Sequence, residues 1–405
     1  MPTLDIAIVG YGSGGQAAAL ALSRDGHRVE VFEQAPRLRP VGAGFLLQPT
    51  GLSALWQLGL LPQVLALGRR VDRLYGENET GRAVMDMRYE GLDRRLFGLG
   101  LQRGALFEVL RDAWPGAGEV RTNCRIAGTE DDGRVLVDAE GRRHGPYDLV
   151  VAADGAASGL RAGVGEARLD RAYPWGALWC LVPEAAWPWG HELRQRYRRA
   201  REMAGMLPVG TRPGDATPRL SFFWSLPAAA LAQWPDGDLA AWKAGVSRLW
   251  PELEPMLGGV TEAPMLAKAR YRDAIPRAWS KGRLVLLGDA AHAMSPQLGQ
   301  GVNMALLDAL ALRDALRGDG SVESALAHYG ATRRAHVAVY QFWSRWLTPV
   351  FQSDRDLVAR LRDLAFLPLG RLPGGRGQML RVLAGTQRGW LGRLHLPAGF
   401  LDALG

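Results

Sequence analysis

The chain has 405 residues, of which 47% are hydrophobic and 22% charged, and it carries a net charge of +8. This length and composition are typical of a globular protein of two or three domain-sized units. Two cysteines, Cys124 and Cys180, are too few for a disulfide framework or a thiolate metal site, and no apolar run is long enough to span a bilayer. An apolar strand begins at Asp5, too early for a signal peptide, so we expect a cytoplasmic protein without a transmembrane segment.

The positive charge raises the question of a nucleic-acid partner. All but three of the basic residues are arginines, and they are scattered rather than grouped in blocks. No recognition helix, zinc finger or RNA-binding signature accompanies them. We therefore expect no nucleic-acid partner, and we interpret the charge as a surface that attracts anionic cofactors or as an arginine-rich coding bias.

Residues 5–33 follow the order strand, glycine turn, helix, strand. The apolar strand Ile6–Val9 leads into the sequence GYGSGG of residues 10–15, a small-residue helix and a second strand, Arg28–Phe32, which ends in Glu33. Glycines at these spacings allow a tight turn, the approach of a pyrophosphate to the backbone and close packing of helix on sheet, and an acid at the end of the second strand binds ribose hydroxyls. The segment predicts a dinucleotide site, but it does not distinguish FAD from NAD.

The middle of the chain changes character. Residues 101–114 have helical spacing, and the strands Val135–Asp138 and Leu149–Ala153 follow. From about 165 to 280, tryptophans and prolines accumulate between short strand-like runs, which predicts a second domain that contains a sheet.

The chain then returns to a buried strand, residues 283–288. This strand ends in Gly288-Asp289, and the loop SPQLGQGVN of residues 295–303 leads into a helix that extends to about Arg317. A carboxylate at a strand end accepts hydrogen bonds from ligand hydroxyls, and a glycine loop at a helix N-terminus presents backbone amides. A flavin requires both, so this second site favours FAD over NAD.

These segments together resemble the para-hydroxybenzoate hydroxylase family, the class A flavoprotein monooxygenases. The resemblance covers roughly residues 5–345 and rests on three motifs in order. They are the glycine turn with Glu33, the sequence DGAASGLR of residues 154–161, and Gly288-Asp289 with the glycine loop after it. Arg103 lies where the family usually has an arginine that contacts FAD.

The resemblance implies FAD as the cofactor and NADH or NADPH as the co-substrate. It also implies a set of cofactor-binding residues: Gly10, Gly12, Ser13, Gly14, Gly15, Glu33, Gln34, Gly44, Arg103, Asp154, Gly155, Arg161, Gly288, Asp289, Gly301, Val302 and Asn303. Reduced flavin would react with O2 to give a C4a-hydroperoxide that hydroxylates the substrate. The residues expected near the reacting ring are Pro296, Gly299, Gln300 and Gly301, with His292 as a further candidate whose pKa range suits acid–base chemistry. No metal site is expected.

The expected substrate is an apolar aromatic or polycyclic small molecule. The candidate pocket residues are Gln48, Trp179, Tyr197, Met206, Phe222 and Trp224, although for any single apolar or aromatic one a position in the domain core is more common than ligand contact. No arginine stands out as a binder of a substrate carboxylate, so a simple benzoate is not favoured.

Other functions compete with the hydroxylase interpretation. A related FAD-dependent reductase or oxidase would share these motifs, and the FAD fold also serves as a pure binding protein. The segment WPWGH of residues 187–191 contains half of a halogenase motif but lacks the Ile-Pro that completes it. The basic, tryptophan-bearing tail fits either helices packed on the flavin domain, which we favour, or a helical region on an anionic membrane surface.

The expected fold is α/β. A Rossmann-like FAD-binding domain is assembled from residues 1–75, 100–164 and 281–340. Residues 76–99 and 165–280 form an inserted β-sheet domain for the substrate, and 341–405 form a helical C-terminal region that is broken near Pro368 to Gly375. We expect a monomer or a homodimer.

Overall fold

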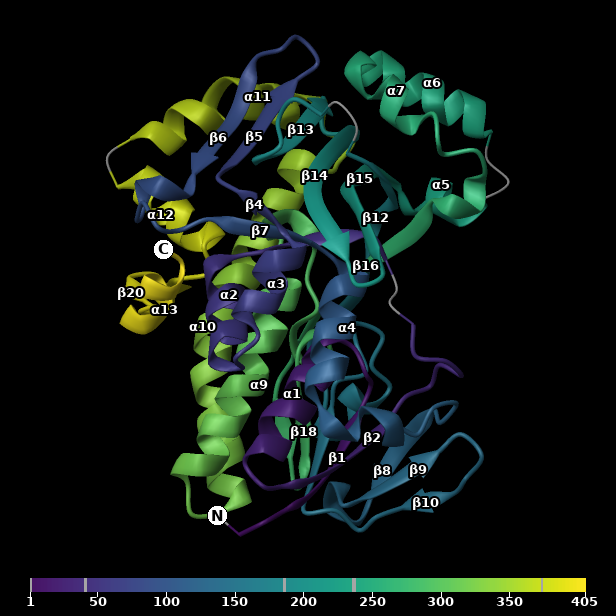
Figure 1. Ribbon diagram of the computed structural model, residues 1–405, viewed down its shortest axis with the longest axis vertical. Helices are drawn as coiled ribbons and strands as arrows, with labels where there is room; N and C mark the ends of the chain where they lie inside the picture. Colours follow the sequence, from purple (N-terminus) through teal and green to yellow (C-terminus); the bar gives the residue numbers. More distant parts are fainter. Residues whose placement is uncertain (1, 40–41, 185–186, 235–237, 373) are drawn as a thin grey trace.

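A five-stranded sheet forms the base of the molecule in the computed structural model, which describes residues 2–39, 42–184, 187–234, 238–372 and 374–405 (Figure 1). Its strand order is β17-β18-β11-β1-β2, and only β17 is antiparallel to its neighbour. The strands are β1 (Asp5–Val9), β2 (Arg28–Phe32), β11 (Leu149–Ala152), β17 (Ser280–Lys281) and β18 (Leu284–Leu286). The central strands are continuous apolar runs because both faces of a parallel sheet are covered.

Helices cover this sheet. They are α1 (Ser13–Arg24), α4 (Arg103–Ala113), α9 (Gly301–Gly318) and α10 (Val322–Phe351). The helix α1 packs against α4 and α9, and α9 packs against α10. Every residue of α1 from Gly15 to Leu22 is buried, which explains its run of alanines. The antiparallel strands β8 (Ile126–Glu130), β9 (Val135–Asp138) and β10 (Arg143–His144) form a separate small sheet.

Three strands and two helices lie between this base and the upper sheet. The strand β7 (Gly98–Gln102) pairs with both β3 (Gly44–Leu47) and β4 (Arg69–Val71). The helices α2 (Pro49–Gln57) and α3 (Leu61–Leu67) follow β3 in the chain, and α2 packs against α9. Short 3-10 turns connect other elements at Tyr89–Gly91, Pro115–Glu119, Asp131–Gly133, Leu160–Val164, Pro251–Leu253, Ala263–Met265 and Pro296–Leu298.

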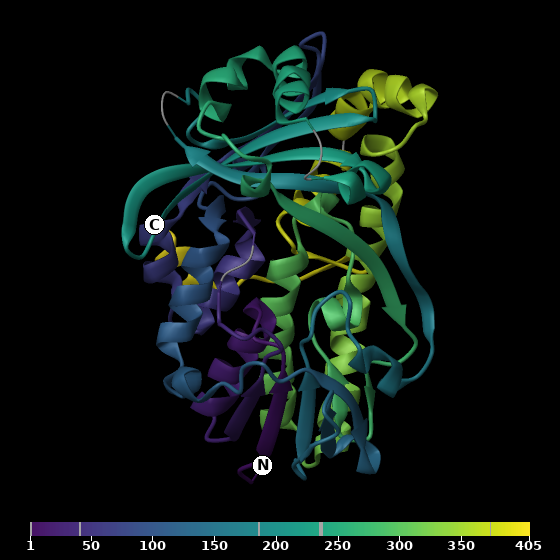
Figure 2. The ribbon, with the colours of Figure 1, turned by 90° about the vertical axis from the view of Figure 1, so that its right-hand side faces the viewer.

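A seven-stranded sheet lies across the upper half of the molecule, and helices cover its upper face (Figure 2). In sheet order the strands are β16 (Ala267–Pro276), β12 (Ala167–Pro183), β15 (Asp215–Pro227), β14 (Glu202–Arg212), β13 (Glu192–Arg198), β5 (Arg73–Asn78) and β6 (Ala83–Arg88). The covering helices are α5 (Ala228–Gln233), α6 (Leu239–Leu249) and α7 (Glu254–Leu257). The predicted boundary at residues 75–76 therefore falls inside β5.

Alternate residues of β15 face opposite sides of this sheet, as strand geometry requires. Phe222 packs against Trp242 in the core beneath the covering helices. Ser221 faces the other way, and its Oγ accepts a hydrogen bond of 3.1 Å from the backbone N–H of Gly44. Phe223 lies on the same lower side as Ser221, in one apolar cluster with Phe351 of α10.

The C-terminal region contains α11 (Asp356–Arg371), α12 (Gly375–Leu383), the short strands β19 (Gln387–Arg388) and β20 (Gly392–Arg393), and α13 (Ala398–Ala403). The hairpin β19–β20 was not expected. The predicted break is shorter than expected, because α11 continues through Pro368 and ends at Arg371. The boundary expected at residues 340–341 falls inside α10. Within the described residues, no helix is both long and apolar enough to cross a membrane.

Candidate active site

In the glycine turn between β1 and α1, contacts within the protein explain Gly10 and Gly15 but not Gly12. Gly10 has φ +101°, and a Cβ there would lie 2.4 Å from the carbonyl oxygen of Ala153. A Cβ on Gly15 would lie 2.0 Å from the carbonyl oxygen of Gly10, so only glycine allows this packing. Gly12 is exposed, and a Cβ there would meet nothing within 4 Å. Close approach of a ligand explains that glycine.

The backbone amides of this turn are available to an anion. Gly12 is the N-cap of α1, and no side chain caps the helix. Ser13 and Gly14, in the first turn, are half-buried. An uncapped helix N-terminus that opens to solvent is a ready binding site for phosphate groups.

Glu33 follows β2 directly and lies beside the turn. Its two carboxylate oxygens accept hydrogen bonds of 2.8 Å from the backbone N–H groups of Tyr11 and Ala35. These bonds fix the carboxylate at the edge of the sheet and leave each oxygen a further lone pair for a ligand hydroxyl. Gln34, the next residue, is exposed.

A second carboxylate, that of Asp289, lies at the end of β18. Asp289 is the first residue of α8 (Asp289–His292) and is exposed, and its side chain has no hydrogen bond or ion pair to any residue that the structure describes. Gly288, just before it, has φ +61°. Because β1 and β18 are parallel strands of one sheet, Asp289 and the glycine turn lie at the same edge, where open α/β sheets bind their ligands.

Arg161 holds the Asp-Gly segment and the Asp289 loop together. Its guanidinium, which is almost fully buried, donates to the carbonyl oxygens of Ala290 at 2.8 Å and Asp289 at 3.1 Å and pairs with Asp170. Asp154 uses one carboxylate oxygen to accept from the N–H of Gly159, while the other is buried without a partner. In this structure Arg161 is thus a positioning residue, and Asp154 retains an acceptor for a ligand.

Arg103 is an exposed cation beside the segment that starts β3. Its side chain makes no hydrogen bond or ion pair with any described residue, and a Cβ on Gly42 would lie 2.7 Å from its Cδ. Gly44 is also tightly enclosed, because a Cβ there would lie 2.5 Å from Cγ1 of Val209. The backbone N–H of Arg103 donates to the carbonyl oxygen of Ala43, which fixes the helix start against this segment.

These features fit FAD. The free amides and open space at Gly12 suit a pyrophosphate, and the carboxylates of Glu33 and Asp289 suit ribose and ribityl hydroxyls. The unpartnered oxygen of Asp154 would be costly to bury without a ligand donor. The free cation of Arg103 lies where it can offset negative charge.

Hydrogen bonds from three side chains hold the glycine loop of residues 295–303 in place, and we had expected these side chains near the cofactor or the substrate. Nε2 of Gln300 donates to the carbonyl oxygen of Leu383 at 2.7 Å, and Oδ1 of Asn303 accepts from the N–H of Gln48 at 2.9 Å. Oε1 of Gln48 accepts from the hydroxyl of Tyr89, and its Nε2 has no partner. All three side chains are buried, so in this structure they position the loop. Gly299, with φ +61°, is its exposed point.

The remaining loop residues are less enclosed. Pro296, Gly301 and Val302 are half-buried, as is Gly155 in the Asp-Gly segment. A Cβ on Gly301 would lie 3.8 Å from Oδ1 of Asp289, which places the start of α9 beside that carboxylate.

His292 was a candidate for acid–base chemistry, and the structure places it elsewhere. Its ring is fully buried, and Nε2 lies 2.6 Å from Oδ2 of Asp308 on α9. The other oxygen of Asp308 accepts from Nε of Arg333 at 2.6 Å, and Nη1 of Arg333 contacts Nδ1 of His336 at 2.6 Å. His292 therefore belongs to a buried polar network, which the sequence did not reveal because its members come from three helices.

Burial and charge act in opposite directions on this network. Burial favours the neutral form of Asp308, but His292 and Arg333 outweigh it and lower its pKa to about 2. Burial lowers the pKa of His336 to about 3, and the charge of Arg333 acts in the same direction. The network thus holds an ionised carboxylate and a neutral imidazole.

Three aromatic side chains, those of Trp179, Phe223 and Tyr271, lie together on the lower side of the seven-stranded sheet. Nε1 of Trp179 donates to the hydroxyl oxygen of Tyr271 at 3.1 Å, and the rings of Trp179 and Phe223 are 5.0 Å apart. The hydroxyl proton of Tyr271 has no acceptor among the described residues. Burial raises the pKa of Tyr271 to about 12, against an opposing contribution from nearby Arg103, so its phenol is neutral.

The structure separates the predicted substrate residues. Met206, Phe222 and Trp224 lie in the core beneath α5–α7, on the opposite side of the sheet from Trp179. Tyr197 packs against Phe351 of α10 and is fully buried. Sequence analysis missed Phe223 and Tyr271; the alternation of β15 would have identified Phe223 once one inward residue was known.

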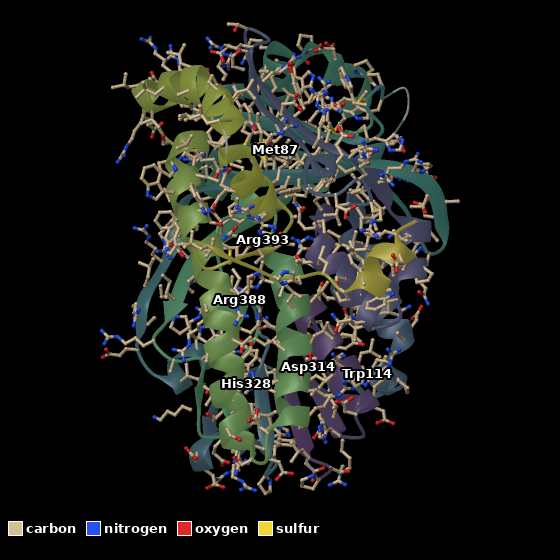
Figure 3. All side chains as sticks on the ribbon, turned by 90° about the vertical axis from the view of Figure 1, so that its left-hand side faces the viewer. Met87, Trp114, Asp314, His328, Arg388 and Arg393 are labelled. Atoms are coloured by element: carbon tan, nitrogen blue, oxygen red, sulfur yellow. The ribbon has the colours of Figure 1, made fainter. Side chains whose placement is uncertain are left out.

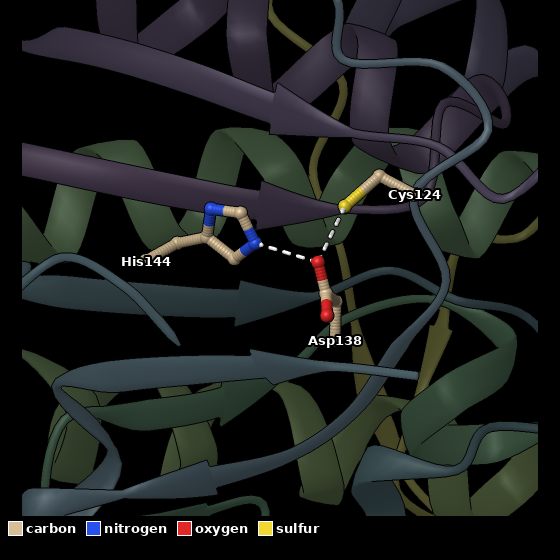
Figure 4. Close-up of side chains that lie close together, drawn as sticks. All are labelled: Cys124, Asp138 and His144. Atoms are coloured by element: carbon tan, nitrogen blue, oxygen red, sulfur yellow. Dashed lines mark hydrogen bonds and ion pairs between the residues drawn. The ribbon is translucent and has the colours of Figure 1, made fainter. Parts of the chain in front are cut away.

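Three potential metal ligands lie close together beside Phe32: Asp138 and His144 of the small sheet and Cys124 just before it (Figure 4). The carboxylate of Asp138 already accepts from the N–H groups of Glu140 and Arg142, from Nε of Arg142 at 2.7 Å and from His144 at 3.0 Å. Burial opposes its ionisation, but His144 and Arg142 outweigh this and hold the pKa of Asp138 well below its usual range. This cluster closes the β9–β10 turn, and a metal ion would have to displace the Arg142 cation.

The fold and the site define an FAD-dependent oxidoreductase. A model of the family described as "FAD binding domain" matches residues 3–342. The chain is 31% identical over 370 residues to the Rhodococcus erythropolis protein named "Probable 2-heptyl-3-hydroxy-4(1H)-quinolone synthase AqdB2", covering 89% of this chain and 88% of that protein. It is 30% identical over 403 residues to the aurachin C monooxygenase/isomerase of Stigmatella aurantiaca, covering 90% and 99%.

A solved structure gives the same result. The tetrameric form of 2-methyl-3-hydroxypyridine-5-carboxylic acid oxygenase superposes with a TM-score of 0.74 at 25% identity, covering 90% of this chain and 98% of that one. The chain belongs to this family of FAD-dependent monooxygenases, the class A hydroxylases of aromatic and heteroaromatic compounds. The fold expected from the sequence is confirmed.

Proposed function

We propose that the protein uses FAD, O2 and NADH or NADPH to hydroxylate an apolar, fused heteroaromatic molecule. The proposal rests on the three aromatic side chains on the lower side of the seven-stranded sheet. Trp179 and Phe223 would provide apolar contacts to the substrate, and Tyr271 would donate a hydrogen bond to it. An apolar site with a few polar groups that fix orientation is typical of small-molecule sites. FAD, when bound, supplies the redox chemistry and activates oxygen.

The residues of this chain would bind, orient and exclude water. Glu33, Asp154 and Asp289 would hold hydroxyls of the cofactor, and the amides at Gly12 would hold its phosphates. Arg161 would keep the Asp289 loop in place, and the phenol of Tyr271 would donate to a carbonyl or ring oxygen of the substrate. No second glycine turn of the same kind occurs in the sequence, so the nicotinamide co-substrate would dock transiently.

The 4-quinolones are the substrate class to test first. Two of the relatives carry names that refer to a 4-quinolone and to aurachin C, and a quinolone combines a fused ring with a carbonyl acceptor for Tyr271. A benzoate is less suitable, because Arg345 is already paired with Asp273 at 2.6 Å and we assign the nearby Arg103 to FAD.

The test is to mix the purified flavoprotein anaerobically with NADH or NADPH and then admit oxygen, with and without a 4-alkylquinolone. We expect nicotinamide to bleach the flavin, oxygen to restore it, and the product to gain the mass of one oxygen atom. The variant Tyr271→Phe keeps the ring and should lower kcat/KM roughly tenfold at unchanged FAD content, the effect of one lost hydrogen bond. Reoxidation without any oxygenated product across a set of fused heteroaromatics would instead favour an oxidase.

A further inference from the structure

The helix α11 presents leucines to solvent. Leu357, Leu361 and Leu364 recur at helical spacing along one side, and Leu369 in the last turn and Leu372 just after the helix are also exposed; these five side chains are 55–69% exposed. Exposed single leucines are common in proteins, but three on one side of a helix with two more at its end are an unusual concentration of exposed apolar side chains.

The inner side of α11 carries two charged residues beside the apolar Ala359 and Phe366, whereas an ordinary surface helix keeps its charges on the outer side. Arg362 is almost fully buried, and its guanidinium lies over the rings of Tyr197 at 4.9 Å and Phe351 at 5.3 Å. Its neighbour Asp363 accepts a hydrogen bond of 3.0 Å from Nδ2 of Asn78. These inward contacts fix the rotation of the helix, because turning the leucines inward would break them.

Aromatic residues of α10 and of the β19–β20 turn form a second exposed apolar group in the C-terminal region. Trp346 of α10 is 63% exposed, and Trp390 and Leu391 in the turn between β19 and β20 are 57% and 95% exposed. Phe342 joins them, since its ring centroid lies 4.9 Å from that of Trp390 and 6.5 Å from that of Trp346. Tryptophan is the side chain that proteins place at the boundary between lipid and water. We call these residues and the five leucines the leucine face.

The C-terminal region that carries the leucine face has a strongly positive net charge. Residues 341–405 contain nine arginines, four aspartates and no glutamate or lysine, which accounts for +5 of the net charge of +8. All four aspartates are paired with arginines: Asp354, Asp356, Asp363 and Asp402. Five exposed arginines have no ion pair among the described residues: Arg355, Arg360, Arg376, Arg388 and Arg393. Figure 3 shows Arg388 and Arg393 on the same side of the molecule as α11 and α12.

We propose that the leucine face binds the surface of an anionic lipid bilayer. Apolar and tryptophan side chains would enter the boundary between headgroups and acyl chains, and the unpaired arginines would contact anionic headgroups. A second copy of the chain fits this surface less well, because a two-fold interface brings the same patch of both copies together and would oppose two sets of unpaired arginines. The proposal does not depend on the reaction that the enzyme catalyses.

The test is flotation of the intact flavoprotein with vesicles of phosphatidylcholine alone or mixed with phosphatidylglycerol. We expect the protein to float with the mixed vesicles, at least tenfold less with phosphatidylcholine alone, and less as salt rises. The triple substitution Leu357→Glu, Leu361→Glu, Leu364→Glu should reduce binding to mixed vesicles at least tenfold. Met265→Glu is the control, because Met265 is an exposed apolar residue (46%) that lies between α7 and β16, outside the leucine face.

Unchanged FAD content and melting temperature would show that each variant is folded. Failure of the wild-type protein to float with mixed vesicles at low salt would overturn the proposal, and so would equal flotation of the triple variant. Sedimentation velocity tests whether the leucine face instead binds a second copy of the chain. A concentration-dependent dimer that the leucine substitutions abolish, in a protein that does not bind vesicles, would show this and would also overturn the proposal.

Discussion

Nε2 of His292 lies 2.6 Å from Oδ2 of Asp308, and neither side chain is exposed to solvent. The same Asp308 oxygen accepts a hydrogen bond of 2.9 Å from the backbone N–H of Gly288, the residue before Asp289. Buried hydrogen bonds to Asp308 therefore hold the end of β18, where the candidate ribityl-binding carboxylate lies, against α9. Arg333 extends the connection to α10, and His336 extends it to the carbonyl oxygen of Gly385.

The neutral state of His336 should make the stability of the protein depend on pH. Its pKa is about 3 in the folded protein and ~6.5 when unfolded, so the unfolded state binds more protons between these values. His336 should therefore lower the free energy of unfolding as pH falls below ~6.5, by at most about 1.4 kcal/mol per pH unit. Urea unfolding at several pH values between 7 and 5 measures this slope.

The matched variants are His336→Asn and His395→Asn. The first should be less stable at neutral pH but show a shallower slope, and the second, at an exposed position, should retain the wild-type slope. A slope that is the same in wild type and His336→Asn would contradict the assignment of a neutral, buried His336.

Two glycines of the turn should respond differently to alanine. Gly15→Ala pushes a methyl group to 2.0 Å from the carbonyl oxygen of Gly10, so it should destabilise the apoprotein by about 2 kcal/mol or more. Gly12→Ala meets open space, so the apoprotein should keep its stability to within about 0.5 kcal/mol. If a pyrophosphate lies against Gly12, this variant should nevertheless bind FAD at least tenfold more weakly. Denaturant melts and fluorescence titration with FAD measure the two effects, and wild-type FAD affinity in Gly12→Ala would refute the phosphate site.

Adjacent phenylalanines on opposite sides of one strand offer a test of the substrate face. Phe222 is fully buried against Trp242, so Phe222→Ala should cost about 3–5 kcal/mol of stability. Phe223 faces Trp179, so Phe223→Ala should raise the KM for an aromatic substrate several-fold. Substrate kinetics at a temperature where both variants remain folded separate the two roles. A larger change in KM for Phe222→Ala than for Phe223→Ala would place the substrate on the side of the sheet that faces α5–α7 and would contradict the proposed site.

The sequence by itself determined the nucleotide-binding part of this protein. The glycine turn with Glu33 and the strand that ends in Gly288-Asp289 are local patterns, because a tight turn, a strand and a helix start each depend on a few consecutive residues. Their order along the chain predicted the family, which the comparisons confirm. The strand Arg28–Phe32 was predicted with the bounds that the structure has.

Only the tertiary structure decided which side chains face the site. In a strand, neighbouring residues face opposite sides, and an apolar strand covered on both sides gives no sign of which side is which. Met206, Phe222 and Trp224 were therefore indistinguishable in the sequence from Phe223. The role of His292 likewise depended on Asp308 and Arg333, which lie 16 and 41 residues away along the chain and meet it only because α9 and α10 pack against the sheet. The charged inner side of α11 has the same cause, since its partners Asn78 and Tyr197 come from strands far apart in the sequence.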